Sequence, residues 1–458
     1  MRRSGVRRRL RVVLQAPEIF PLLGFFLLIV LGSLLLELSP MHRLGAVSYL
    51  DALFTSTSAV CVTGLTTVNT ATDFTVAGQS VILVLIQLGG LGIMAYAGMA
   101  LALAHRRLSL RTRAAVANPL LYGETGREFA RRLRQIFAAA FGVEAAGVLL
   151  LFVTLLGQTE APRAAWLALF HGVSAFCNAG FSVLPDNLVG VRGNHPFMAV
   201  IALLIVCGGL GLVVLHEFWE RLVAAVRREQ WLKQRRLSLH ARVVLLTSAL
   251  LIVGGAGLML LFGLTPAEQG WGERVAAAFF QSISARTCGY NTINLGALPL
   301  ASLLVLVFLM FIGGSPGSCA GGVKTTSLAV TLARLRSHFR GQEHTTLMGW
   351  RLSPNVVRNA GLLFSLALLW NLVGVLLLAY FENGRPGIGL HNLVFEQISA
   401  FGTVGLSTGV TASLTGGSKL VLIATMYVGR LGPLTLVSLA APRRPARVLF
   451  PEGKVMIG

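Results

Sequence analysis

Eight long apolar runs dominate the pattern of hydrophobic and polar positions along this chain of 458 residues. A helix that crosses a bilayer needs about 20 mostly apolar residues, and each run is close to that length or longer. We therefore predict membrane-spanning helices over residues 19–36, 76–104, 135–156, 197–215, 243–264, 298–323, 359–381 and 420–439. The first run is too long for a cleaved signal peptide, and no small-residue cleavage site follows it.

A shorter semi-apolar stretch separates the two members of each pair of runs and leads into a motif centred on glycine. The motifs are VCVTGLTT, CNAGFS, RTCGYNT and FGTVGLSTG, centred on Gly64, Gly180, Gly289 and Gly405. A phenylalanine that we expect to be equivalent stands ten residues before each glycine: Phe54, Phe170, Phe279 and Phe395. Three motifs also have a serine six residues before the glycine: Ser58, Ser174 and Ser399.

This periodicity predicts a chain of four repeats, each made of a span, a re-entrant segment and a second span. The predicted units are residues 1–110, 111–240, 241–350 and 351–458, the last including the C-terminal tail. Irregular backbone at membrane depth is tolerated only where it is buried in protein or faces water. We therefore predict an all-α membrane protein with eight transmembrane helices and four re-entrant pore helices around one central pore with pseudo-four-fold symmetry.

The charge of the chain gives its orientation. The net charge is +21, but only 12% of residues are charged and 54% are hydrophobic, which argues against a disordered chain and against a soluble nucleic-acid-binding protein. Of the 39 basic residues, 31 fall in the N-terminal tail and in residues 106–134, 221–242, 324–358 and 443–454. The positive-inside rule places these segments, and both termini, in the cytoplasm.

Four glycine segments that converge on an axis could select a cation through backbone oxygens. Rings of carbonyl groups replace the hydration shell of a potassium ion in known filters, and glycine adopts the backbone conformations that such a segment needs. The motifs contain no carboxylate, which favours a monovalent ion. A single motif of this kind would be an ordinary turn, but four in register favour a pore. We predict a monovalent cation at the carbonyl groups of Val62, Thr63, Gly64, Asn178, Ala179, Gly180, Thr287, Cys288, Gly289, Thr403, Val404 and Gly405.

The sixth apolar run is interrupted by GGSPGSCAGG, residues 313–322, in which six of ten residues are glycine or proline. A continuous helix is therefore not expected there. One interpretation is a kinked span that packs through small residues. The other is an intramembrane loop that obstructs the pore below the filter, and this predicted gate comprises Gly313, Gly314, Ser315, Pro316, Gly317 and Ser318.

Two arginines stand inside the apolar part of the chain. Arg430 occupies a position where the other repeats have glycine, and an intramembrane arginine usually faces the protein interior or a water-filled cavity. It could cap carbonyl groups, pair with Glu144, or act as an electrostatic barrier just inside the filter, as part of the gate. Arg286 stands three residues before Gly289, and we expect it to brace the filter from behind, against Glu396.

Together with GGSPGSCAGGVKTT and GRLGPLT, the four motifs make nearly the whole chain resemble the Trk/Ktr/HKT superfamily of potassium transporters. The resemblance is greatest to the KtrB-type membrane subunit of the bacterial Ktr system. It implies potassium uptake across the bacterial cytoplasmic membrane, through a channel-like pore that the loop of the third repeat and a cytosolic regulatory subunit gate. The family has a basic residue at the position of Arg430.

The resemblance also implies a homodimer in the lipid bilayer, with a KtrA-type nucleotide-binding ring subunit as partner and Na⁺ as a candidate activator. We expect no nucleotide site on this chain and no nucleic-acid partner. The alternatives are a Trk-type potassium/sodium or potassium/proton symport subunit and, less favoured, a secondary transporter of another solute. An enzyme is not expected, because no nucleophile–base pair or metal-ligand set recurs at one depth, and the five cysteines contain no CxxC motif.

Overall fold

The computed structural model describes residues 19–104, 126–226, 237–263 and 270–432, apart from Leu44 and Ala46. The described chain consists of fourteen α-helices, short 3-10 turns and one two-stranded hairpin, formed by β1 (Thr346–Leu347) and β2 (Trp350–Arg351). The predicted cytoplasmic tails at both ends, and parts of the basic segments at 106–134 and 221–242, lie outside the described residues. The prediction of a mostly helical chain is confirmed.

Each predicted span contains helix, but 197–215 is divided between two helices, 298–323 breaks after Phe311, and residues 433–439 of the last span lie outside the described residues. Every glycine motif follows a shorter helix. The first long helices of the repeats are α2 (Ile19–Glu37), α6 (Gly126–Leu155), α11 (Leu239–Phe262) and α15 (Pro354–Phe381). The short helices are α3 (Tyr49–Val60), α7 (Ala161–Phe176), α12 (Trp271–Ser284) and α16 (Leu390–Gly402). The second long helices are α4 (Val76–Ala104), α8 (His195–Leu210), α13 (Leu300–Phe311) and α17 (Gly416–Leu431).

The helices differ in whether each could cross a membrane by itself. Among the described residues, three helical stretches are long and apolar enough: 134–155, 239–262 and 354–381. Helix α9 (Leu212–Val226) continues α8 at an angle of 108°, and the two would count as a fourth, broken span. The predicted break in 298–323 is confirmed, because α13 ends at Phe311 and the next helix, α14 (Thr325–Phe339), begins after a loop.

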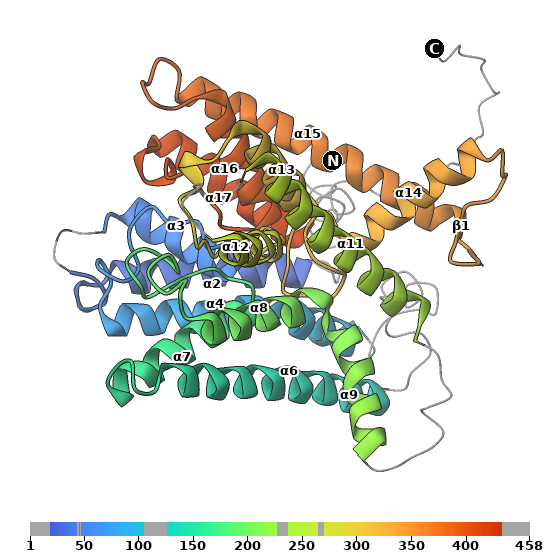
Figure 1. The fold of residues 1–458 in the computed structure, drawn as a ribbon, viewed down its shortest axis with the longest axis horizontal. Coiled ribbons are helices and arrows are strands. Elements are labelled where there is room, and N and C mark those ends of the chain that lie inside the picture. The colour runs from blue at the N-terminus through green and yellow to red at the C-terminus, as the bar shows by residue number, and fades with distance from the viewer. Residues whose placement is uncertain are drawn as a thin grey trace, which may run out of the picture.

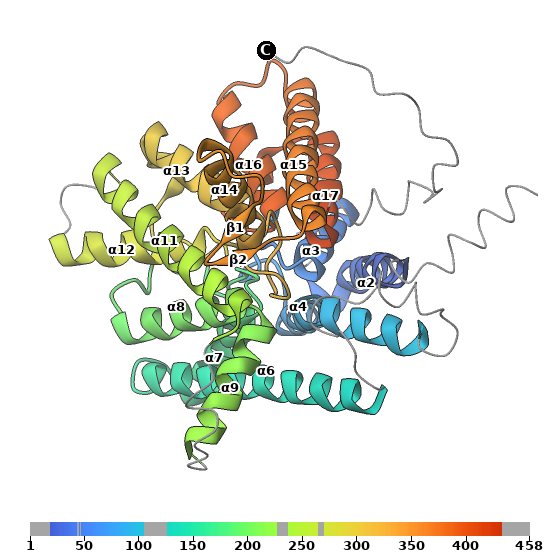
Figure 2. The same ribbon diagram turned by 90° about the vertical axis from the view of Figure 1, so that its right-hand side faces the viewer.

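The helices of the four predicted repeats surround a common centre. Figure 2 shows α2 and α4 on one side, α6 to α8 next to them, then α11 to α13, and finally α15 to α17. Between repeats, the second long helix of one packs on the short helix of the next: α4 on α7, α8 on α12, α13 on α16, and α17 on α3. The long helices of the different repeats run along similar directions (Figure 1). The order of these contacts closes a ring from a linear chain.

The ring has one seam, where the fourth repeat meets the first. There, Lys419 of α17 forms an ion pair of 2.9 Å with Asp51 of α3. The hydroxyl of Tyr427 donates to the carbonyl oxygen of Leu22 at 2.6 Å. No covalent connection joins the two repeats at this position. These polar contacts therefore help to hold them together.

Glycines allow the short helices to approach the first long helix of their own repeat. The facing pairs are Gly32–Ser56, Gly172–Val148, Gly255–Ser282 and Gly374–Gln397. In three repeats the glycine lies on the long helix, and in the second it lies on the short one. A Cβ at any of these positions would overlap its partner, so the close helix packing that is common in membranes depends on these glycines.

Candidate functional site

The chain adopts the same unusual backbone conformation after each short helix. The residue two before the motif glycine has a positive φ in all four repeats: 57° at Val62, 60° at Asn178, 91° at Thr287 and 49° at Thr403. The glycine itself also has a positive φ: 90° at Gly64, 67° at Gly180, 85° at Gly289 and 95° at Gly405. Each segment thus has two residues of positive φ separated by one residue that is not among the positive-φ residues. A left-handed non-glycine residue costs about 1–2 kcal/mol, so tertiary packing must hold these segments.

The four glycines pack in a closed ring. A Cβ on Gly64 would overlap the carbonyl oxygen of Ala179, and one on Gly180 would overlap that of Cys288. A Cβ on Gly289 would overlap the oxygen of Val404, and one on Gly405 would overlap that of Thr63, which returns to the first repeat. The partner is in each case the residue directly before the next motif glycine. The structure therefore brings all four predicted filter segments together around one centre.

A serine of each short helix anchors its motif. The Oγ atoms of Ser58 and Ser399 accept hydrogen bonds from the N–H groups of Gly64 (3.0 Å) and Gly405 (3.1 Å). In the other two repeats the serine donates to the carbonyl oxygen directly after the glycine: Ser174 to Phe181 (2.9 Å) and Ser284 to Tyr290 (2.5 Å). Ser284 was missed by sequence reasoning, because it stands five residues before its glycine and not six.

The third repeat is therefore one residue shorter than the others between serine and glycine. The same shift decides which phenylalanine is buried: Phe280 is 6% exposed, whereas Phe279 is 38% exposed. The prediction that Phe279 is equivalent to Phe54, Phe170 and Phe395 is wrong, since those three are fully buried. A Ser-Ala pair in every motif was the signal that could have given the correct register: Ser58-Ala59, Ser174-Ala175, Ser284-Ala285 and Ser399-Ala400.

One end of the ring opens into a pocket of about 260 Å³. Gly64 and Gly180 form part of its wall, and the polar side chains that line it are hydroxyls and amides: Thr66, Thr67, Thr70, Asn69, Ser182 and Asn187. None of its lining residues is charged. A cation at this end would therefore meet neutral dipoles, as the absence of carboxylates from the motifs predicts.

The loop between α13 and α14 lies against two segments of the ring. A Cβ on Gly321 would overlap the side chain of Thr403, and one on Gly313 would stand 3.2 Å from the Cγ2 atom of Thr287. The loop is also hydrogen bonded to the second repeat, where Ser315 N donates to Gly209 O and Leu212 N donates to Gly317 O, both at 3.0 Å. The predicted gate residues thus lie beside a filter segment, through Gly313, and are bonded to the second repeat, through Ser315 and Gly317.

The loop is held by its own polar groups as well. Ser318 Oγ donates to the carbonyl oxygen of Ser315 at 2.7 Å, and the hydroxyls of Ser315 and Thr325 lie 3.0 Å apart. Lys324 Nζ donates to the carbonyl oxygens of Ala320 (2.5 Å) and Gly321 (3.3 Å). These bonds give the non-helical segment a defined shape at a depth where unsatisfied backbone groups would be costly.

Arg430 joins three repeats. Its side chain is 3% exposed and donates to the carbonyl oxygens of Cys319 in the loop and of Gly89 (2.7 Å) and Gly90 (3.3 Å) on α4. Carbonyl capping is therefore observed and pairing with Glu144 is wrong, while the electrostatic barrier stays a prediction. Together, Arg430 and Lys324 place two cations on three successive carbonyl groups of the loop, those of residues 319–321.

The predicted pair between Arg286 and Glu396 is also wrong. Arg286 donates to Ser248 of α11, to its Oγ at 3.1 Å and to its carbonyl oxygen at 3.4 Å. Glu396 is held within its own repeat by Ser407, Thr408 and Thr411. Arg286 therefore ties the end of the third short helix to its first long helix, and the carboxylate has a different role.

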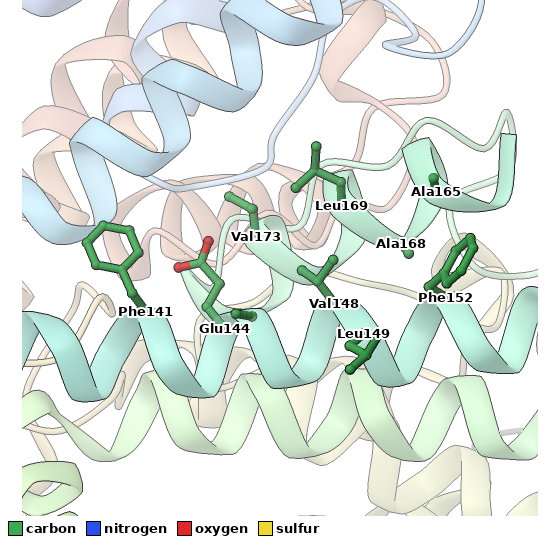
Figure 3. A pocket seen from close by; sticks show the side chains of 10 residues that line it. Phe141, Glu144, Val148, Leu149, Phe152, Ala165, Ala168, Leu169 and Val173 are labelled. Carbon is green, nitrogen blue, oxygen red and sulfur yellow. The ribbon is translucent and has the colours of Figure 1, made fainter. Parts of the chain in front are cut away.

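Glu144 faces a second pocket, of about 430 Å³, between α6 and α7. Figure 3 shows its carboxylate on α6 among apolar side chains, which include Phe141, Val148 and Val173. Gln87 of α4 donates to this carboxylate at 2.9 Å, and the thiol of Cys177 donates to Gln87 at 3.4 Å. All five cysteines are free thiols.

Comparison with known proteins agrees with this geometry. A family model described as a cation transport protein, TrkH, matches residues 26–448. The chain is 37% identical to the potassium/sodium uptake protein NtpJ of Enterococcus hirae, over 95% of this chain and 96% of that protein. It is 33% identical to the Ktr system potassium uptake protein B of Bacillus subtilis, over 95% of each.

A solved structure has the same fold. The potassium transporter TrkH from Vibrio parahaemolyticus aligns with a TM-score of 0.73 and 21% sequence identity, over 93% of this chain and 85% of that one. At this identity the similarity concerns the fold. The arrangement of helices around the four glycine segments is therefore one that a membrane transporter is known to adopt.

Proposed function

The chain belongs to the TrkH family of cation transport proteins, and we propose that it takes up potassium ions through the ring of four glycine segments. The observation that carries the proposal is the closure of the ring, in which each motif glycine lies against the carbonyl group that precedes the next one. Backbone oxygens gathered in this way can replace the water around a dehydrated cation. The names of the two curated relatives support potassium as the ion.

The proposed pore has pseudo-four-fold symmetry and consists of the units 1–110, 111–240, 241–350 and 351–458. The cyclic packing of each second long helix on the next short helix supports this division. The twelve filter residues predicted from the sequence would hold potassium through their carbonyl groups, three in each repeat. Positive φ values at two positions in every segment support a shared backbone role.

The gate of this pore is the loop of the third repeat, together with Arg430. The contacts of Gly313 and Gly321 with the filter segments support this assignment, because an ion that leaves the ring inward would meet the loop first. The positive charge of Arg430 would oppose a cation there. Opening then requires the loop to release Gly209 and Leu212 of the second repeat, as well as Arg430.

We place the protein in the bacterial cytoplasmic membrane as a multi-pass homodimer with both termini inside. A KtrA-type ring subunit is the proposed partner, supported by the relative that is named as part of a Ktr system. The basic residues concentrated at the predicted cytoplasmic side would suit an acidic or phosphate-bearing docking surface. Signals from the partner would reach the gate through α14, which begins directly after the loop.

A second candidate is coupled uptake of potassium and sodium. The observation that favours it is the 37% identity to a protein named for both ions. In this case Na⁺ would be a co-transported ion and not only an activator. Both candidates use the same ring, so ion dependence of the flux separates them.

The test is potassium flux by the purified protein in lipid vesicles, with and without Na⁺. We expect potassium uptake down an imposed gradient, and rescue of growth at low potassium in a bacterium that lacks its own uptake systems. Vesicles without protein are the control. Absence of potassium flux from correctly inserted protein would overturn the proposal, and flux that requires Na⁺ and carries it would select the coupled mechanism.

A further inference from the structure

One position on each short helix lies behind the filter and has no part in the function described so far. It is the residue directly after the buried phenylalanine, occupied in the four repeats by Thr55, His171, Gln281 and Glu396. All four side chains are buried, with exposed fractions of 0–1%. The four residue types differ in polarity and charge, although the short helices that hold them are equivalent.

Two of the four side chains reach the segment beyond the glycine. His171 Nε2 lies 2.9 Å from Ser182 Oγ, and Glu396 Oε1 accepts from Ser407 Oγ at 2.6 Å. Ser182 and Ser407 each stand two residues after their motif glycine. The bonds therefore tie the outer end of a filter segment to the helix behind it, in the second and fourth repeats.

The first and third repeats lack this tie. Among the described residues, the hydroxyl of Thr55 has no hydrogen-bond partner, and neither the oxygen nor the nitrogen of the Gln281 amide has one. The third repeat is held differently, since the hydroxyl of Tyr290 donates to the carbonyl oxygen of Phe181 in the second repeat at 2.9 Å. The filter segments are thus supported unequally, although their backbones are alike.

The two ties also differ in charge. His171 Nδ1 lies 2.8 Å from the carbonyl oxygen of Leu167, which can only accept, so Nδ1 donates to it. His171 Nε2 faces the Ser182 hydroxyl, which also donates to the carbonyl oxygen of Asn187 at 3.2 Å. Glu396 accepts three hydrogen bonds, from Ser407 Oγ (2.6 Å), Thr411 Oγ1 (2.7 Å) and the Thr408 N–H (3.1 Å).

All three groups face the two carboxylate oxygens, and an ionised carboxylate can only accept hydrogen bonds. No basic side chain of the described chain is bonded to Glu396. Arg286, which we had expected to pair with Glu396, donates to Ser248 instead.

We propose that Glu396 is a positioning and specificity residue of the filter. It fixes the outer end of the fourth segment, and it is the only one of the four equivalent residues whose side chain can be an anion. The inference rests on the proposed uptake of potassium through this ring. A buried anion behind neutral carbonyl groups attracts a cation as it loses its water. The three bonds limit the movement of residues 407–411, and with it the width of the outer end.

The test is the Glu396→Gln variant of the full-length protein in lipid vesicles, which keeps the shape of the side chain and removes its charge. We expect the KM for potassium to rise about tenfold, with a smaller change in the maximal rate, because charge-assisted bonds and one attractive charge are lost. The preference for K⁺ over Na⁺ should fall in the same variant. A change in fold alone would lower the maximal rate without altering this preference.

The matched control is Gln281→Leu, at the equivalent position of the third short helix. It removes a polar side chain that forms no bond, so KM should stay within about twofold of the unaltered protein. If Glu396→Gln does not fold, Ser407→Ala and Thr411→Val keep the charge and each remove one donor, and each should raise KM about threefold.

An unaltered KM and K⁺ preference in folded Glu396→Gln, or an equal change in Gln281→Leu, would overturn this inference alone. Failure of the unaltered protein to take up potassium would overturn the proposed function as well.

Discussion

The ring of glycine segments and the layer directly beneath it are built in opposite ways. In the ring, all four repeats contribute the same backbone conformation, while the residues before the glycines differ: Thr63, Ala179, Cys288 and Val404. In the layer beneath, one repeat contributes a loop and another contributes Arg430, where the other three repeats have glycine.

The difference follows from the chemistry of the two layers. Any residue supplies a carbonyl group, so a backbone ring tolerates variation in its side chains and asks only for the glycine. A barrier of charge needs one cation, and four arginines around one axis would repel one another. One Arg430 also suffices to cap carbonyl groups of two other repeats. The four repeats are therefore alike in the ring, where backbone groups act, and differ in the layer of the loop and Arg430, where a single side chain acts.

The largest expected effect comes from breaking the symmetric layer with Gly405→Ser or Gly64→Ser. Each position has a φ near 90° and no room for a Cβ beside the next carbonyl group. The conformational cost alone is about 1–2 kcal/mol, and about 1.4 kcal/mol corresponds to a factor of ten. We therefore expect the preference for K⁺ over Na⁺ in a flux assay to fall about tenfold or more.

The control for this prediction is Gly384→Ser, which shares the positive φ (77°) but has open space around the added atom. It should destabilise its turn and leave ion preference unaltered. An unchanged preference in Gly405→Ser and Gly64→Ser would show that the ring is not the filter.

The next effect tests the asymmetric layer. Deleting residues 315–317 removes the two main-chain bonds from the loop to Gly209 and Leu212, so the basal potassium flux should rise several-fold in vesicles without a partner subunit. Deletion of residues 348–349, in the turn of the exposed hairpin between β1 and β2, is the control and should not alter the flux. A folded loop variant with the same or lower flux would contradict the gate.

Substitution of Arg430, beneath the ring, should have a smaller effect on flux and a measurable effect on stability. Arg430→Gln removes the positive barrier, so we expect the basal flux to rise a few-fold. It also leaves buried carbonyl groups without donors, which costs about 1–3 kcal/mol and should lower the melting temperature. Arg358→Gln, at an exposed site, should change neither measurement. A lowered melting temperature with an unaltered flux would assign Arg430 a purely structural role.

The smallest effect concerns the seam of the ring at the outer surface. Burial raises the pKa of Asp51, but hydrogen bonds from Ser48 and Lys419 outweigh it and bring that pKa below the ordinary value of 3.8. The folded protein thus favours the ionised form, so this stabilisation is present above pH 3.8 and is lost as the pH falls through the lower folded pKa.

Asp51→Asn should therefore lower the thermal stability slightly at pH 7, by about 0–1 kcal/mol, and the difference should shrink as the pH falls below 3.8. Potassium flux should not change. Asp186→Asn, at an exposed carboxylate, is the control. A difference between Asp51→Asn and the unaltered protein that persists at pH 3 would show that Lys419 stabilises the seam by packing and not by charge.

Much of the fold could be predicted from the sequence because its signals are local. The apolar runs contain helices, and the glycine- and proline-rich stretch at 313–322 interrupts one of them. The four motif glycines have the positive φ that glycine adopts more readily than other residues. These properties depend on neighbouring residues, whose effect on backbone conformation and burial acts over a few positions.

The partners of the buried charged groups, and the register of the third repeat, were decided only by the tertiary structure. Arg430 bonds to Gly89 across 341 positions of the chain, and Glu396 bonds to hydroxyls of its own repeat and not to Arg286. Composition and periodicity determine that a segment is buried and where it turns. They do not determine which distant carbonyl or hydroxyl group will stand beside a buried charge, because that depends on the order in which the four repeats close into a ring.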